Sequence, residues 1–169
     1  MTDPQPPAAD RPVMPGYGIL PADQGSRLIA WPEAERRLTV AHDYWLATVR
    51  PDGRPHVMPV WGVWLEGRLW FSSGLRSRKA RNLAADARCT ITTDDARNPV
   101  VVDGTADRAT DLGRIAGFVA AVNAKYQAGV TVEFQDPGVN GTYAVRPITV
   151  IALTDGDFPG SPTRWRFKA

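Results

Sequence analysis

The stretch YWLATVRPDGRPHVMPVWGVWL, residues 44–65, decides the fold class. Two runs rich in aromatic and β-branched residues flank the turn residues PDG at positions 51–53, an arrangement typical of an antiparallel β-hairpin. The second run contains Pro55 and Pro59, and proline cannot donate a hydrogen bond to a neighbouring strand. We therefore predict that this strand lies at an edge of its sheet or is bulged, with free backbone groups beside it for a ligand.

Further strands and three helices are expected around the hairpin. Helices are predicted from Trp31 with Pro32 in the first turn, over residues 75–86, and after an N-cap at Asp111. Strands are predicted over residues 68–73, 88–94, 99–110 with a bend at Gly104, 142–154 and 163–167, with a loop over 127–141. Consecutive antiparallel strands with few helices indicate a mainly β fold, a small barrel with helices at its ends and flank.

The length of 169 residues is typical of one domain with one sizeable core. Residues 1–27 contain six prolines and few large apolar side chains. We therefore predict an irregular, Pro-rich N-terminal arm over residues 1–27 and a single domain over residues 28–169.

Composition excludes several classes of function. The formal net charge of +2 does not indicate nucleic-acid binding, and no apolar stretch is long enough to span a membrane. The single cysteine, Cys89, excludes a disulfide framework within the chain and provides no Cys-based metal site. The N-terminus has no signal-peptide pattern. We expect a cytoplasmic protein without a metal ion.

An anion site is predicted in the stretch FSSGLRSRKARN, residues 71–82. A strand ends in serines and a glycine, and a helix begins near Ser77, so the first backbone N–H groups of that helix have no partner within it. Four cations crowd this N-terminus: Arg76, Arg78, Lys79 and Arg81. Cations there oppose the helix dipole, and a bound anion would resolve that conflict. The alternative is that Ser77 is only an N-cap and the cations form a solvated face.

With these motifs in order, the sequence resembles the flavin-binding split-barrel proteins of the pyridoxamine 5'-phosphate oxidase class. The resemblance covers about residues 34–168. It rests on L-A-T-x-x-x-D-G-x-P-H-x-x-P-V, then F-x-S, then S-x-K-x-x-N-L, and a closing R-W-R-F. The details are most similar to the actinobacterial branch that uses the deazaflavin coenzyme F-420.

The resemblance implies a homodimer of split barrels with a cofactor in each of two grooves at the interface. It implies that the cofactor phosphate is held by Ser72, Ser73, Ser77, Arg78, Lys79 and Asn82. It implies that the ring lies along the second strand, against His56, Val57, Pro59, Val60 and Trp61. It further implies that the C-terminal Trp165 and Arg166 approach the cofactor, and that Arg76 and Arg81 are candidates for contact with the oligoglutamate tail of the deazaflavin.

Several functions stay open from the sequence. The first is hydride transfer from reduced coenzyme F-420 to an unsaturated or conjugated small molecule, with the hard chemistry carried by the cofactor. FMN-dependent oxidoreduction is the alternative, and a non-catalytic flavin-, deazaflavin- or haem-binding protein is another. Oxidation of pyridoxamine phosphate is disfavoured, because the C-terminal TRWRFKA lacks the R-x-H element of enzymes with that activity. His56 is either a proton donor near the ring or a partly buried strand residue, and Tyr126 either packs or lines a substrate pocket.

Overall fold

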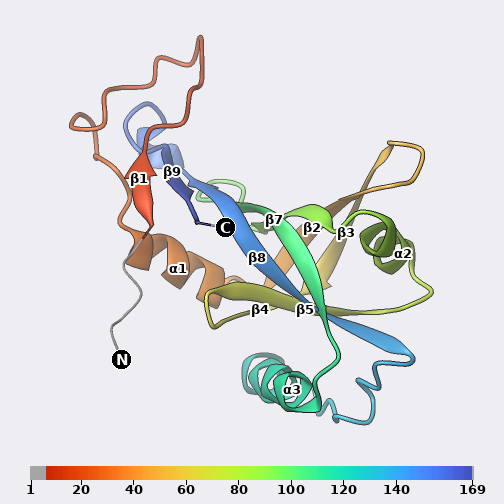
Figure 1. The fold of residues 1–169 in the computed structure, drawn as a ribbon. Coiled ribbons are helices and arrows are strands. Elements are labelled where there is room, and N and C mark those ends of the chain that lie inside the picture. Colours follow the sequence, from red (N-terminus) through yellow and green to blue (C-terminus); the bar gives the residue numbers. More distant parts are fainter. Residues whose placement is uncertain (1–6, 169) are drawn as a thin grey trace.

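The structure, a computed structural model, describes residues 7–168 (Figure 1). In chain order these residues form β1 (Ala8–Asp10), α1 (Trp31–Val40), β2 (Asp43–Val49), β3 (Pro55–Trp61), β4 (Val63–Leu65), β5 (Arg68–Gly74), α2 (Arg78–Ala85), β6 (Arg88–Thr93), β7 (Val100–Ala109), α3 (Leu112–Tyr126), β8 (Asn140–Ala152), the 3-10 turn η1 (Asp155–Asp157) and β9 (Thr163–Arg166). No helix among them combines the length and hydropathy needed to cross a membrane.

The strands form one antiparallel sheet that closes into a split barrel. The sheet runs in the order β1-β9-β8-β7-β6-β2-β3, and β5 pairs with β8 and with β4. The long strand β8 is shared, because its first half pairs with β5 and its last residues pair with β9 while β7 follows nearly its whole length. Within residues 7–168, β3 pairs with β2 alone, so the barrel is open between β3 and β5. The predicted mainly β, split-barrel fold is confirmed.

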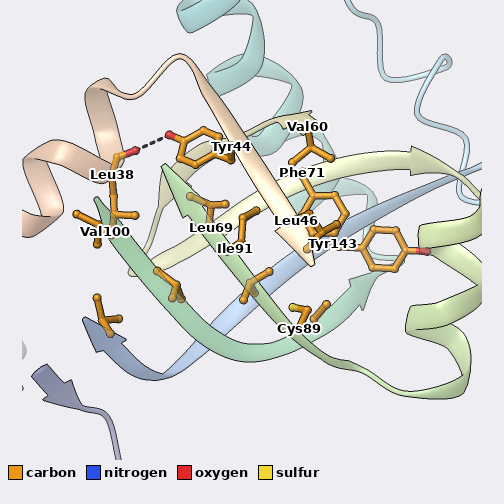
Figure 2. Packing of buried hydrophobic residues seen from close by; sticks show 14 of the residues in the cluster. Leu38, Tyr44, Leu46, Val60, Leu69, Phe71, Cys89, Ile91, Val100 and Tyr143 are labelled. Atoms are coloured by element: carbon orange, nitrogen blue, oxygen red, sulfur yellow. Dashed lines mark hydrogen bonds between the residues drawn. The ribbon is translucent and has the colours of Figure 1, made fainter. Parts of the chain in front are cut away.

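One apolar core fills the barrel. Inward side chains of seven strands, β2, β3 and β5 to β9, belong to a single cluster, of which Figure 2 shows a part. Its members include Tyr44, Leu46, Val60, Leu69, Phe71, Ile91, Val100, Val102, Val145, Val150 and Trp165. Helix α1 adds Ala34 and Leu38 to this core, and α2 adds Ala80 and Leu83. The two helices meet opposite ends of β2, because Tyr44 donates a hydrogen bond to the carbonyl oxygen of Leu38 whereas Thr48 contacts α2. Helix α2 therefore covers the end of the barrel where β5 finishes.

A second cluster attaches α3 to the outside of the barrel. Its members are Val63, Trp70, Ala109, Ala144 and the α3 side chains Ile115, Phe118, Val119 and Val122. Asp111 caps this helix by accepting a hydrogen bond from the N–H of Arg114, as predicted. The C-terminal end of α3 reaches the junction between β3 and β4.

The prolines of β3 have the predicted effect, since this strand is an edge strand. The predicted bend at Gly104 is also confirmed, because the pairing of β7 with β8 shifts register between Asp103 and Gly104. A Cβ atom at Gly104 would lie 2.2 Å from the carbonyl oxygen of Arg146, so only glycine fits this close approach.

Three elements differ from the sequence-based expectations. Gly62 divides the second predicted strand into β3 and β4, and α2 begins at Arg78 rather than at residue 75. Residues 8–10, within the predicted irregular arm, form β1. The partner of this short strand is β9, at the far end of the chain, so local sequence carries no signal for it. Residues 1–6 of the predicted arm lie outside the described residues.

Candidate functional site

The N-terminus of α2 is held by two serines. Ser77 is the N-cap, and its hydroxyl accepts a hydrogen bond from the N–H of Ala80 at 3.2 Å. The hydroxyl of Ser73, at the end of β5, lies 2.8 Å from that of Ser77. The helix thereby starts shortly after the strand, with its free N–H groups near the end of β5.

The four cations around this N-terminus are electrostatically unbalanced. Within residues 7–168, Arg76, Arg78, Lys79 and Arg81 form no ion pair, whereas eight other arginines do. The first turn of α2 contains no acidic residue. The field at this helix terminus is therefore positive from both the backbone and the side chains, which favours an anion.

The β2–β3 hairpin brings two further basic groups to the same place. Burial, with the charges of Arg50, Lys79 and Arg78, lowers the pKa of His56 below its usual value of 6.5. His56 therefore lies in the field of cations that come from two different elements. Arg50 was not among the predicted site residues, since a single arginine before a turn carries no functional signal.

Buried polar atoms without a partner concentrate here. In the described part of the chain, four buried side-chain nitrogen or oxygen atoms have no hydrogen-bond partner, and three of them are Arg50 Nε, His56 Nδ1 and Asn82 Oδ1. Such atoms are rare in folded proteins, because burying them unpaired is costly. Their concentration beside four unpaired cations makes this end of the barrel a candidate ligand site.

Asn82 joins α2 to the hairpin. Its side chain is fully buried, and its amide nitrogen donates to the hydroxyl oxygen of Thr48 at 2.9 Å. The Thr48 hydroxyl in turn lies 3.4 Å from the carbonyl oxygen of His56, a long contact. Thr48 was also missed from the sequence, although a threonine at an inward position of an apolar strand is a signal that could have identified it.

The predicted phosphate residues divide between two faces of β5. Ser73 faces α2, whereas Ser72 points to the opposite face and accepts a hydrogen bond from Gln135 Nε2 at 3.2 Å. The structure therefore brings Ser73 together with Ser77, Arg78 and Lys79, but it does not bring Ser72 to them.

The predicted ring residues divide in the same way along β3. His56 and Val60 face the barrel interior, and Val60 belongs to the core. Val57, Pro59 and Trp61 are exposed on the outer face. A ligand that lies along one face of β3 therefore contacts the backbone and every second side chain, and it does not contact all five predicted ring residues.

The end of β3 is held by the last residues of α3. Tyr126 stacks on Trp61, and Lys125 Nζ donates to Tyr44 Oη at 2.8 Å and to the carbonyl oxygen of Gly62 at 2.9 Å. Burial lowers the pKa of Lys125 from 10.5 to about 8. Tyr126 packs, which is one of the two roles considered for it, and the ring it packs on is one of the predicted cofactor contacts.

Trp165 and Arg166 lie far across the sheet from α2. Trp165 is 1% exposed and packs in the core against Trp31. Arg166 points outward and forms an ion pair with Asp10. Strand pairing places Arg166 and Val57 at the two ends of one row across the sheet, so both side chains lie on the outer face. Four strands separate them, and the residues between them in the row are Thr149, Asp103, Thr90 and Ala47. Within one chain the structure does not bring these two residues to the other predicted site residues.

The outer face near β2 is hollowed, and its lining mixes apolar and polar side chains. A hollow of about 420 Å³ is lined by residues that include Ala47, Val49, Thr90, Asp103 and Ile148.

No cluster of three or more His, Cys, Asp or Glu side chains suited to a metal ion occurs in residues 7–168.

Comparison with known proteins agrees with the barrel. Residues 31–153 match the family described as pyridoxamine 5'-phosphate oxidase. No curated protein matches the chain significantly. Among solved structures, the chain is similar to a protein named F420 reductase, at 28% identity and a TM-score of 0.57, over 69% of this chain and 94% of that one.

Two further structures share the fold at lower identity. A conserved hypothetical protein from Mycobacterium tuberculosis is 19% identical, with a TM-score of 0.65 over 82% of this chain and 85% of that one. A heme-binding protein from Mycobacterium smegmatis is 23% identical, with a TM-score of 0.60 over 78% of this chain and 56% of that one. At these identities the likeness concerns the fold alone.

Proposed function

Because the chain belongs to the pyridoxamine 5'-phosphate oxidase family, we propose that it binds a phosphorylated, flavin-like cofactor between α2 and β3. The proposed cofactor is the deazaflavin coenzyme F-420, and the proposed reaction is hydride transfer from its reduced form to an unsaturated or conjugated small molecule. The observation that carries the proposal is the concentration, at the N-terminus of α2, of cations without an ion pair in residues 7–168, together with the unpartnered buried nitrogen atoms of Arg50 and His56.

The residues at this terminus fit a phosphate group. Arg78 and Lys79 carry charge without an acidic partner in the described chain, and Ser77 and Ser73 place hydroxyls beside the free N–H groups of the helix. Charge-assisted hydrogen bonds of this kind are the strong ones, and arginine offers a planar fork that matches phosphate oxygens. In this proposal Ser77, Arg78 and Lys79 hold the phosphate.

The edge strand β3 fits the ring of such a cofactor. Its free backbone N–H and C=O groups are available to the polar edge of a heterocycle, because among the described residues the strand pairs with β2 alone. When bound, the reduced deazaflavin supplies the hydride, and the protein supplies placement and electrostatics. His56 is the side chain that we propose for proton donation beside the ring. Burial and the nearby cations lower its pKa, and a bound phosphate would offset those cations and favour the protonated imidazolium that proton donation requires.

Two features favour the deazaflavin over FMN. Arg76 and Arg81 are exposed and have no acidic partner in residues 7–168, so the site has more positive charge than one phosphate requires. The solved F420 reductase is also similar over most of its length. An FMN-dependent enzyme is the alternative, followed by a binding protein without turnover.

A homodimer belongs to the same proposal. Trp45, Val49, Val57 and Trp61 are each at least 39% exposed, and they share the outer face of β2 and β3. Exposed apolar patches of this kind are typical of protein interfaces. The C-terminal prediction adds a requirement to this proposal: the dimer must bring Arg166 of one subunit to β3 of the other.

The proposal is tested by mixing the purified protein separately with coenzyme F-420, FMN and haem and measuring binding by fluorescence or absorbance. We expect binding of the deazaflavin, and reoxidation of its reduced form when a conjugated acceptor is added. Tight binding of FMN with none of the deazaflavin would overturn the choice of cofactor. Binding of the deazaflavin without turnover across conjugated acceptors would favour the non-catalytic alternative.

A further inference from the structure

We infer that Asn82 is a positioning residue, which acts through Thr48 to fix the spacing and orientation of the anion-binding end of α2 relative to β3. The inference rests on the proposed function, because it assigns a task to two parts of that site. It also differs from the role expected from the sequence, in which Asn82 contacts the cofactor phosphate itself.

The contacts form a short path between the two elements. Asn82 Nδ2 donates to Thr48 Oγ1 at 2.9 Å, and Thr48 Oγ1 lies 3.4 Å from the carbonyl oxygen of His56. Asn82 is in the first turns of α2, Thr48 is in β2, and His56 is in the strand proposed to face the ring. The path thus crosses from the phosphate end of the site to the ring end inside the protein.

Burial separates Asn82 from any direct contact with a ligand. Asn82 is 0% exposed and Thr48 is 2% exposed, whereas Arg78 on the same helix is exposed. A ligand that enters from solvent therefore meets Arg78 and Lys79 and does not reach the amide of Asn82.

A purely structural anchor does not account for an amide at this position. The Oδ1 atom of Asn82 is buried without a partner, an arrangement that costs stability compared with an apolar side chain of similar size. Helix α2 already has apolar anchors in Ala80 and Leu83. A directional hydrogen bond adds what those contacts lack, because it fixes the orientation and spacing of two elements rather than only their proximity.

The expected consequence concerns ligands that touch both elements at once. A cofactor that bridges α2 and β3 binds best when their spacing is set before binding, whereas a ligand that touches one element gains nothing from it. Loss of the Asn82–Thr48 hydrogen bond should therefore lower the affinity for the whole cofactor by about fivefold, which corresponds to the net contribution of one neutral hydrogen bond. The affinities for its separate parts should stay unchanged.

The test compares Asn82→Ala and Thr48→Val with the wild-type chain. The ligands are coenzyme F-420 or FMN, whichever the wild type binds, the same cofactor without its phosphate, and inorganic phosphate. Thr93→Val is the matched control. Thr93 is 5% exposed, and its hydroxyl accepts a hydrogen bond from the N–H of Val100. It lies at the opposite end of β6 from Cys89, the residue that pairs with Thr48. Thr48→Ser retains the hydroxyl and should restore affinity for the whole cofactor.

A second readout needs no cofactor. The chain has two histidines, and we expect Asn82→Ala and Thr48→Val to shift the NMR signals of His56 while His42 stays in place. Thr93→Val should move neither.

The outcomes separate the inference from the proposed function. Lower affinity for the whole cofactor, with unchanged affinity for inorganic phosphate and for the cofactor without its phosphate, supports the positioning role. An equal loss for inorganic phosphate would mean that Asn82 contacts the anion, and unchanged affinity for every ligand would mean that it is only an anchor; either result overturns the inference while the proposed function stands. Failure of the wild-type chain to bind any cofactor would overturn the proposed function first.

Discussion

The ring of Tyr126 lies flat against the indole of Trp61, with centroids 4.6 Å apart and planes inclined by 6°. The hydroxyl of the same tyrosine accepts a hydrogen bond from the N–H of Gly62 at 2.9 Å. Because Gly62 separates β3 from β4, α3 holds the end of β3 both by stacking and by a backbone hydrogen bond.

Replacing Tyr126 by phenylalanine keeps the stack and removes the hydroxyl. We expect the free energy of unfolding to fall by about 1–3 kcal/mol, because the buried N–H of Gly62 loses its partner. Urea unfolding measures the change. Tyr17→Phe is the control, since Tyr17 is 62% exposed and should change stability by less than about 0.5 kcal/mol. Equal stability of the two variants would show that the Gly62 contact contributes nothing.

Removing the two central cations tests the anion site. The double change Arg78→Ala and Lys79→Ala should weaken cofactor binding at least about tenfold, since charge-assisted contacts are typically worth ~1.5–3 kcal/mol each. Arg88→Ala with Arg97→Ala is the matched control, because both arginines are exposed and paired with aspartates. Affinities are measured by fluorescence titration. If both pairs bound the cofactor like the wild type, the cluster would be a solvated face.

The protonation of His56 reports on the charge around it. NMR titration should give a pKa below 6.5 for His56 in the ligand-free chain, since burial and the cations Arg50, Lys79 and Arg78 disfavour the charged ring. Adding inorganic phosphate should raise this pKa, because a bound anion offsets those cations. His42, the other histidine, is the internal reference. No movement of the His56 titration with phosphate would place the anion elsewhere.

The same shift has a consequence for stability. The unfolded chain takes up a proton at His56 near pH 6.5, whereas the folded chain does so only at lower pH. The free energy of unfolding should therefore decline as the pH falls through about 6.5 and below. In His56→Gln this part of the pH dependence should disappear, as measured by urea unfolding between pH 5 and pH 8. An unchanged slope would assign the decline to other groups.

A charge on the outer face of β3 should disrupt the proposed dimer. Val57 is 50% exposed there, and Val57→Lys would bury an unpaired ammonium group in an interface. We expect a monomer by light scattering and loss of cofactor binding with it. Phe134→Lys is the control, because Phe134 is 64% exposed in the loop before β8 and should leave the assembly unchanged. If the Val57→Lys variant had the same mass in solution as the wild type, the subunit interface would not lie on this face.

The fold class and the predicted position of an anion site followed from local chemistry. The prolines of β3 lack the N–H that an inner strand needs, Gly104 allows the close approach of Arg146, and Ser77 caps the helix behind it. The missing N–H of proline, the backbone freedom of glycine and the serine cap each act through a residue's own backbone or its nearest neighbours. Residue type and spacing were therefore enough to predict the edge strand, the bend at Gly104 and the helix start, although not the contact of Gly104 with Arg146.

Only the tertiary structure decided which side chains share a site. Asn82 and Thr48 are 34 residues apart in the chain, and Arg50 comes to His56 and Lys79 because the hairpin folds beneath α2. The alternation of side chains along a strand separates Ser72 from Ser73 and Val57 from His56, and barrel closure decides which of the two faces lies inside. The sequence by itself therefore predicted an anion site at this helix. Barrel closure determined which residues lie around that helix terminus, because contacts between distant segments depend on strand register and on which face is buried.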